Sequence, residues 1–271
     1  MISSAAMMNK GESHEYLIEE LRIVEEWERD QKDLWFWEKL GRLPFVLLDK
    51  LTPKVLREKI GQVVDEVGSY IQSGGRYLIR EEDIIGKFSA NPLSIADIAQ
   101  LPLKNMDRVA EDFKQSRTRV AALQGATTGI GGIFTLAIDI PALLGLSLKT
   151  LQEIAISYGY DPKEKNERIF IVKCMQFVSS DIVGKKAILE ELAAFEQEGT
   201  DKQAFSQLQG WQEVIATYRD NFGWKKLFQM IPIAGILFGA YLNKSTIQDV
   251  GEAGKMLYRK RRILERIEKI G

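Results

Sequence analysis

The chain has 271 residues, 45% of them hydrophobic and 28% charged, with a formal net charge of -1. This length allows one large domain or two, with a substantial hydrophobic core. The near-neutral charge argues against a nucleic-acid-binding protein, and the lone histidine, His14, excludes a Ser-His-Asp triad, a HExxH zinc site and a multi-histidine metal centre.

The N-terminal residues Met1–Glu12 predict a disordered tail, and residues 13–271 predict a single helical domain. The tail has neither the basic region nor the apolar run of a secretory signal. The single cysteine, Cys174, has no partner for an internal disulfide, and both features together favour a cytoplasmic protein.

The first helix is expected from Ser13 to about Leu40, with Ser13 as its N-cap, because leucine and valine recur there at helical spacing. The C-terminal part of this segment is strongly aromatic, with Trp35, Phe36 and Trp37 in succession. Two interpretations are open. These rings anchor the helix to its own domain, or they form an aromatic belt at the depth of lipid head groups.

A second helix is expected at Lys54–Ser73, and Ser94 is expected to cap a short helix that runs to Pro102. A longer helix follows and is expected to continue directly into a glycine-rich segment. Its inward face is expected to carry Met106, Val109, Ala110, Phe113 and Val120.

The most unusual segment is Leu123–Leu148, which is apolar, rich in glycine and contains a single ionisable residue, Asp139. A membrane-spanning helix needs roughly 20 apolar residues, so two spans do not fit. The segment therefore predicts a helical hairpin with Asp139 and Pro141 near its bend. Leu227–Asn243 is a shorter apolar run of similar character. Such hairpins either form the buried centre of a soluble domain or dip part-way into a bilayer.

Asp139 is the principal candidate for a site, because a carboxylate in an apolar hairpin is costly unless it is paired, solvated or protonated. Asp139 either caps a helix that begins near Pro141, or it contacts a partner, cation or lipid head group. Asn243 and Asp249, which adjoin the second apolar run, complete the tentative ligand-binding or partner-binding set with Asp139 and Pro141.

Four further helices are expected in the C-terminal half, at Asn166–Val178, Lys185–Glu198, Phe205–Tyr218 and Ser245–Ile270, the last opened by a capping box of Ser245 and Gln248. Cys174 falls inside the first of them and is expected to be an inert buried thiol.

The last of these helices is expected to present a basic outer face that includes Arg259, Lys260, Arg261 and Arg262. This face either touches anionic lipid or is solvated and partly paired with neighbouring glutamates.

No segment alternates with the period of a β-strand, so the expected fold is all-α. At Gly125–Phe170 a glycine-rich run is followed by Asp-Ile-Pro and Tyr-Gly-Tyr-Asp, and this region closely resembles the EcsC domain family. Ile231–Leu264 and Val24–Asp30 resemble the same family, so the similarity extends over roughly Leu17–Leu264. The family is bacterial and its namesake is encoded beside an ABC transporter. The resemblance implies a cytoplasmic, membrane-associated helical protein, and it supplies no catalytic residues.

Three functional hypotheses remain. The first is a non-enzymatic, membrane-associated or adaptor protein at the inner face of the cell membrane, with lipids or a membrane transporter as partners. The second is a soluble binding protein for a lipid or another apolar ligand. The third, a metal-dependent hydrolase that uses clustered aspartates, is the weakest because no DxD, HExxH, GxSxG or P-loop pattern occurs. No catalytic residue, metal or cofactor is therefore predicted.

Overall fold

The computed structural model describes residues 12–33, 69–70, 79–128, 133–179, 182–197 and 240–270, and within these ranges every regular element is an α-helix. The all-α prediction is confirmed for this part of the chain. The helices are α1 (His14–Asp33), α4 (Glu81–Ile85), α5 (Ile95–Ile98), α6 (Leu103–Thr128), α7 (Ile133–Ser157), α8 (Lys165–Ser179), α9 (Ile182–Gln197) and α12 (Ala240–Ile270). The helix expected at Phe205–Tyr218, and most of the one expected at Lys54–Ser73, lie outside the described residues.

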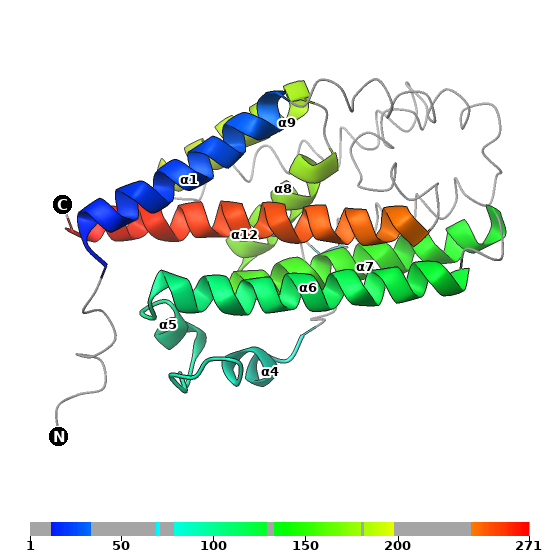
Figure 1. The fold of residues 1–271 in the computed structure, drawn as a ribbon, viewed down its shortest axis with the longest axis horizontal. Helices are drawn as coiled ribbons and strands as arrows, with labels where there is room; N and C mark the ends of the chain where they lie inside the picture. The colour runs from blue at the N-terminus through cyan, green and yellow to red at the C-terminus, as the bar shows by residue number, and fades with distance from the viewer. Residues whose placement is uncertain are drawn as a thin grey trace.

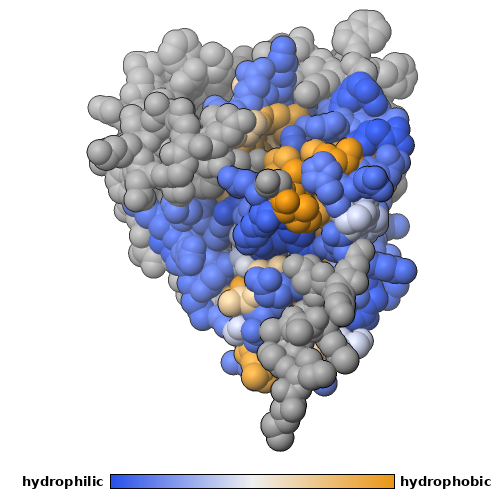
Figure 2. Space-filling view, turned by 90° about the vertical axis from the view of Figure 1, so that its left-hand side faces the viewer, coloured by the Kyte–Doolittle hydropathy of each residue, from blue (hydrophilic) through white to orange (hydrophobic). Residues whose placement is uncertain are grey.

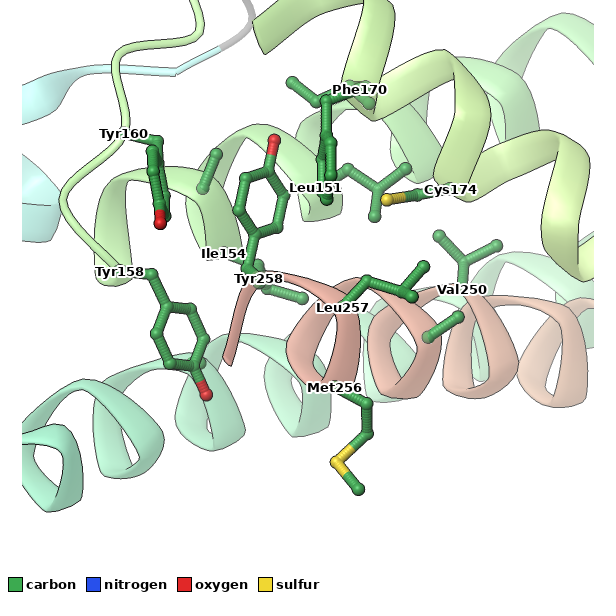
Figure 3. Close-up of a cluster of buried hydrophobic side chains, with 14 of the residues drawn as sticks. Leu151, Ile154, Tyr158, Tyr160, Phe170, Cys174, Val250, Met256, Leu257 and Tyr258 are labelled. Atoms are coloured by element: carbon green, nitrogen blue, oxygen red, sulfur yellow. The ribbon is translucent and has the colours of Figure 1, made fainter. Parts of the chain in front are cut away.

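Three long helices, α6, α7 and α12, lie side by side and form the centre of the structure (Figure 1). Helix α6 runs antiparallel to the other two, α1 crosses α12 on one side, α8 packs on α7 and α12, and α9 packs on α8 and α1. Figure 3 shows the middle of the core, where α7, α8 and α12 meet. The fully buried side chains there include Leu151, Ile154, Tyr158, Phe170, Cys174, Val250 and Tyr258.

Two predicted N-caps are confirmed. The backbone N–H of Tyr16 donates to Ser13 Oγ over 3.2 Å, and the N–H of Asp97 donates to Ser94 Oγ over the same distance. The helix after Ser94 ends at Ile98, earlier than expected. A turn follows it in place of further helix.

The turn that ends α7 is fixed by Gly159. Gly159 has a φ of +80°, which L-residues with a side chain rarely adopt. A Cβ atom at this position would lie 2.6 Å from the Cα of Ala99. The N–H of Tyr160 donates to the carbonyl of Ala155 over 3.0 Å, so the chain leaves the helix with its last carbonyls satisfied. This turn brings Tyr160 against α12.

The predicted bend at Asp139 and Pro141 is wrong. Helix α7 begins at Ile133 and continues through both residues, so Asp139 is not the N-cap of a helix that starts at Pro141. The change of direction between the antiparallel helices α6 and α7 comes before Ile133. An interior proline removes one hydrogen bond, whereas the apolar pattern on both sides of Pro141 keeps the helix going.

The predicted helix start at Ser245 is also wrong, because α12 already begins at Ala240. The residues from Ala240 to Lys244 include neither glycine nor proline, so nothing in them stops the helix from extending upstream.

Candidate functional site

The basic residues of α12 do not form an outer face, and the sequence-based prediction is wrong on this point. Arg259 is 8% exposed and Arg262 is 5% exposed, while Lys260 and Arg261 are half-buried. Helices α1, α6 and α8 cover α12 and bring carboxylates to these cations. Lys260 Nζ, for example, lies 2.8 Å from Glu28 Oε1 of α1. These four side chains therefore offer little surface to a membrane.

Arg259 joins α6 and α1 to α12. Its Nε donates to both carboxylate oxygens of Asp107 on α6 over 3.1 Å, and its guanidinium also pairs with Glu20 on α1. The hydroxyl of Tyr158, just after α7, donates to Asp107 Oδ1 over 2.6 Å. Charge-assisted hydrogen bonds of this kind are the strong ones in proteins, so this group fixes the relative positions of the helices.

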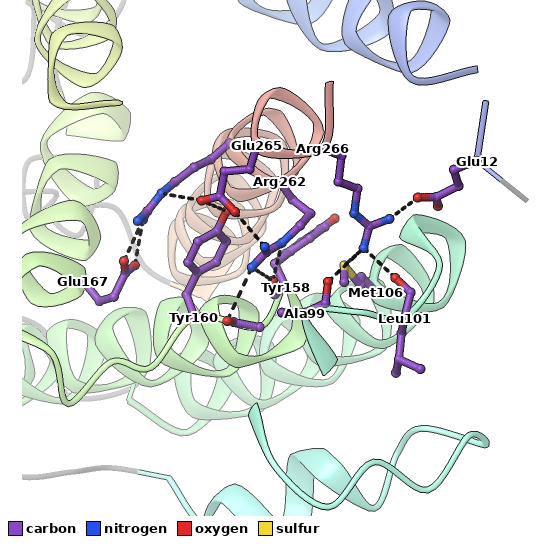
Figure 4. Close-up of polar contacts among 12 residues, drawn as sticks. Glu12, Ala99, Leu101, Met106, Tyr158, Tyr160, Glu167, Arg262, Glu265 and Arg266 are labelled. Atoms are coloured by element: carbon purple, nitrogen blue, oxygen red, sulfur yellow. Dashed lines mark hydrogen bonds and ion pairs between the residues drawn. The ribbon is translucent and has the colours of Figure 1, made fainter. Parts of the chain in front are cut away.

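Two further arginines of α12 bind backbone carbonyls at or just beyond the C-terminal ends of α5 and α7 (Figure 4). Arg262 donates to the carbonyl of Tyr158 over 2.7 and 2.9 Å, and its other amino group pairs with Glu265. Arg266 donates to the carbonyl of Ala99, the C-cap residue of α5, over 3.2 Å, and to the carbonyl of Leu101 in the turn that follows over 2.6 Å. The last carbonyls of a helix lack partners within it, so these arginines act as caps supplied from another helix.

Arg266 also contacts Glu12, a residue that the sequence places in a disordered tail. Glu12 pairs with Arg266, and its Oε1 accepts a hydrogen bond from the N–H of Leu103. The ordered part of the chain thus includes Glu12.

Arg261 pairs with Glu167 of α8 at 2.8 Å. Burial raises the pKa of the Glu167 carboxyl group despite this partner. Burial likewise raises the pKa of the Cys174 thiol, which supports the expected inert character of this cysteine. In the part of the chain that the structure describes, no group of three His, Cys, Asp or Glu residues is placed to hold a metal ion.

Helices α6 and α12 are joined by a row of ion pairs that defines their register. Asp107 pairs with Arg259, Glu111 with Lys255 at 2.7 Å, and Lys114 with Glu252 at 2.5 Å. From one ion pair to the next, the position moves four and then three residues forward along α6. Along α12 it moves four and then three residues back, so the two helices are antiparallel. Helices α6 and α7 are joined by a bidentate pair between Arg117 and Glu153, with distances of 2.6 and 2.7 Å.

Charged residues become rare beyond this row of ion pairs, towards the C-terminal end of α6 and the N-terminal end of α12. Between Gln115 and Ile138 the only charged side chains are Arg117 and Arg119, and between Leu227 and Gln248 the only one is Lys244. Continuing the register places Leu123 of α6 level with Asn243 of α12. The last four residues of the second apolar run, Ala240–Asn243, therefore lie beside the first run at one end of the three-helix core, on the right in Figure 1, although the two are about one hundred residues apart in the chain.

We call this region the apolar end. It comprises Val120–Thr128 of α6, Ile133–Leu148 of α7 and Ala240–Asn243 of α12. Hydrophobic side chains are exposed on it: Leu123 is 70% exposed and Val120, expected in the core, is 41% exposed. None of the helices in the described ranges is both long enough and apolar enough to cross a bilayer.

The predicted ligand-binding residues are partly brought together. Helices α7 and α12 run parallel, and Tyr158 lies beside Arg262 near their C-terminal ends. This register places Asp139 level with Asn243 in the apolar end, with Pro141 in the same part of α7. Asp249, an exposed residue, lies about 10 Å further along α12 at 1.5 Å per residue. The side chains of Asp139, Pro141 and Asn243, and the whole of Trp35, Phe36 and Trp37, lie outside the described residues.

These observations define an all-α protein with a three-helix core that is cross-linked by partly buried ion pairs and ends in an apolar region. The chain belongs to the EcsC protein family, whose family model matches residues 18–263.

Two curated proteins of Bacillus subtilis (strain 168) are similar to it. "Uncharacterized protein YdbA" is 57% identical over 262 residues, which cover 95% of this chain and 96% of that protein. "Protein EcsC" is 31% identical over 169 residues, which cover 62% of this chain and 69% of that protein. No solved structure matches the chain.

Proposed function

We propose that this chain is a peripheral membrane protein that attaches through its apolar end and does not cross the bilayer. The observation that carries the proposal is that the first apolar run and the described end of the second, Ala240–Asn243, lie at the same end of the core, with Leu123 70% exposed there. An exposed apolar surface of this kind marks a membrane or protein interaction site.

Helix lengths support attachment to one leaflet. Beyond Arg119, α6 continues for the nine residues Val120–Thr128, a rise of about 13 Å, and the apolar part of α7 from Ile133 to Leu148 rises about 24 Å. Both lengths are below the roughly 30 Å of the hydrocarbon core. A charged aspartate at the bilayer centre costs about 3 kcal/mol, so Asp139 in α7 also favours a shallow position.

The opposite end of the molecule has a different surface. Figure 2 shows it to be mostly hydrophilic over the described residues, with hydrophobic side chains visible in limited areas. This end also exposes the apolar side chains of Leu93 and Ile270. Ile270, however, follows Glu268 and Lys269, whereas Val120–Thr128 contains no charged residue. This contrast in charge favours a protein that rests on a membrane with its apolar end and keeps its other end in water. The proposal includes the role implied by the family resemblance, an accessory to an ABC transporter or another membrane process at the inner face of the cell membrane.

The test is flotation of the purified protein with phosphatidylcholine–phosphatidylglycerol vesicles. Leu123→Glu removes a leucine contact worth about 1.5–3 kcal/mol and adds a charge, so it should weaken binding at least tenfold. Leu93, which is 91% exposed and lies at the opposite end beside α5, supplies the matched control Leu93→Glu, which should float like the wild type. Thermal unfolding checks that both variants fold.

Failure of the wild type to float on any vesicle would contradict the proposal. Recovery of lipid bound to such non-floating protein would favour instead the soluble carrier of an apolar ligand. Equal loss of flotation in both variants would show that contact is not made through the apolar end.

A further inference from the structure

We infer that anionic lipid head groups are the ligand of the apolar end, bound by a collar of three basic residues at its base: Arg119 of α6, Lys149 of α7 and Lys244 of α12. This inference rests on the proposed function and specifies the lipid that it selects.

The register of the three helices places these residues close to one level. Lys114 pairs with Glu252, so Arg119, five residues further along α6, is level with Ile247 and within one turn of Lys244. Arg117 pairs with Glu153, so Arg119, two residues further, is within one turn of Lys149 on α7. Each of the three core helices thus has one basic residue at the boundary between its apolar part and the rest of the helix.

Basic residues outnumber acids around this level. The ion-pair row between α6 and α12 alternates acids and bases as far as Lys114 and Glu252. Beyond that row, α6 adds Arg117 and Arg119, and α12 adds Asp249 and Lys244. The two acids Glu153 and Asp249 are level with Arg117, nearer the body of the protein than the collar, and Glu153 neutralises Arg117. Arg119 and Lys244 are exposed and form no ion pair with any described residue, whereas Lys149 is half-buried and lies near Glu153.

This arrangement has the geometry of an interfacial anchor. Arg119 and Leu123 are four residues apart, so they lie on the same exposed stripe of α6, with the cation nearer the body of the protein. When the apolar end enters one leaflet, the cation reaches the phosphates of the head groups. Basic residues at this depth attract anionic lipid, and neutral lipid offers them no net charge.

The test compares two double variants with the same change of charge. Arg119→Gln with Lys244→Gln removes two residues of the collar. Lys104→Gln with Lys269→Gln removes exposed lysines from the far ends of the same two helices, α6 and α12. Each protein is titrated with vesicles of phosphatidylcholine alone and with an equimolar mixture of phosphatidylcholine and phosphatidylglycerol, at low and high salt.

The collar variant should bind the anionic vesicles about thirtyfold more weakly than the wild type, because each basic residue near such a surface contributes about fivefold. Its binding to phosphatidylcholine should be unchanged, and the control variant should behave like the wild type. The wild-type preference for anionic vesicles should shrink at high salt.

Equal binding of wild type and collar variant to anionic vesicles would overturn the inference, as would an equal loss in the control variant. Either result leaves the proposed function standing as long as the Leu123→Glu variant still loses binding. Absence of wild-type binding to both kinds of vesicle would instead overturn the proposed function itself.

Discussion

Arg262 shows how a single side chain of α12 holds distant parts of the chain together. Its guanidinium is 5% exposed, donates twice to the carbonyl of Tyr158 and pairs with Glu265. It also lies over the ring of Tyr160, 4.3 Å from the ring centroid. The turn around Gly159 therefore depends on a cation that comes from a helix one hundred residues later.

Replacing Arg262 with methionine should lower the free energy of unfolding by about 3 kcal/mol. The apolar stem is kept, but the carbonyl of Tyr158 and the carboxylate of Glu265 lose a buried partner. Urea denaturation measures the change. Lys269→Met, at an exposed position of the same helix, is the control and should stay within about 0.5 kcal/mol of the wild type. Equal stability of the two variants would contradict this structural role of Arg262.

The burial of these arginines could not be predicted from sequence. A run of basic residues near the end of a chain is usually a solvated face, because arginine and lysine are almost never buried unless they are paired. Their partners Glu20, Asp107 and Glu167 are far away in the chain, and only the packing of α1, α6 and α8 brings them to α12. Local caps were predictable because Ser13 and Ser94 act within four residues of themselves.

At the scale of the elements, the row of ion pairs between α6 and α12 sets which residues of the two helices face each other. Glu111 is its central acid and accepts from Lys114 and Lys255 at 2.9 and 2.7 Å. Burial tends to raise the pKa of this carboxyl group, but the hydrogen bonds of the two lysines and Gln115 outweigh burial and lower the pKa to about 2.

The contribution of Glu111 should therefore depend on pH. Its pKa is lower in the folded state than the ordinary value near 4.5, so its stabilisation is present above that value and is lost as the pH falls towards 2. Glu111→Gln should cost about 1 to 2 kcal/mol at pH 7, since the side chain is partly exposed and screened. The deficit should shrink between pH 5 and pH 2.

Urea denaturation of wild type and variant at several pH values measures this deficit. Glu190→Gln, at an exposed position of α9, serves as the control with a small effect. A deficit of Glu111→Gln that stays constant down to pH 2 would show that the carboxylate does not stabilise the row through its charge.

The helices themselves were largely predictable, because their apolar periodicity is strong. Met106, Val109 and Phe113 are buried as expected from their spacing. The helix ends were less predictable where no cap operates. Pro141 predicts a break, but a long apolar helix runs through it, and Ser245 predicts a helix start, but α12 already begins at Ala240.

At the scale of the whole molecule, the first apolar run and the described end of the second, Ala240–Asn243, lie at one end of the core and distinguish it from the other end. The sequence shows both segments but not that they lie side by side, because this follows from the antiparallel register of α6 and α12. The sequence also suggests the wrong basic residues for a membrane contact. Arg259–Arg262 are turned into the core, whereas isolated cations such as Arg119 and Lys244 are exposed beside the apolar end.

Hydrogen exchange locates the membrane contact in the intact protein. On anionic vesicles, the amides of α6 from Val120 to Thr128 should exchange more slowly, because lipid excludes water from this end and suppresses fraying of the helix. Amides of α1 and α5, which lie towards the other end, should exchange as they do without vesicles. The same comparison with the Leu123→Glu variant should show no protection of Val120–Thr128. Slower exchange confined to α1 or α5 would place the contact at the hydrophilic end and contradict the orientation argued here, since a rigid three-helix core has no means of presenting both ends to one bilayer.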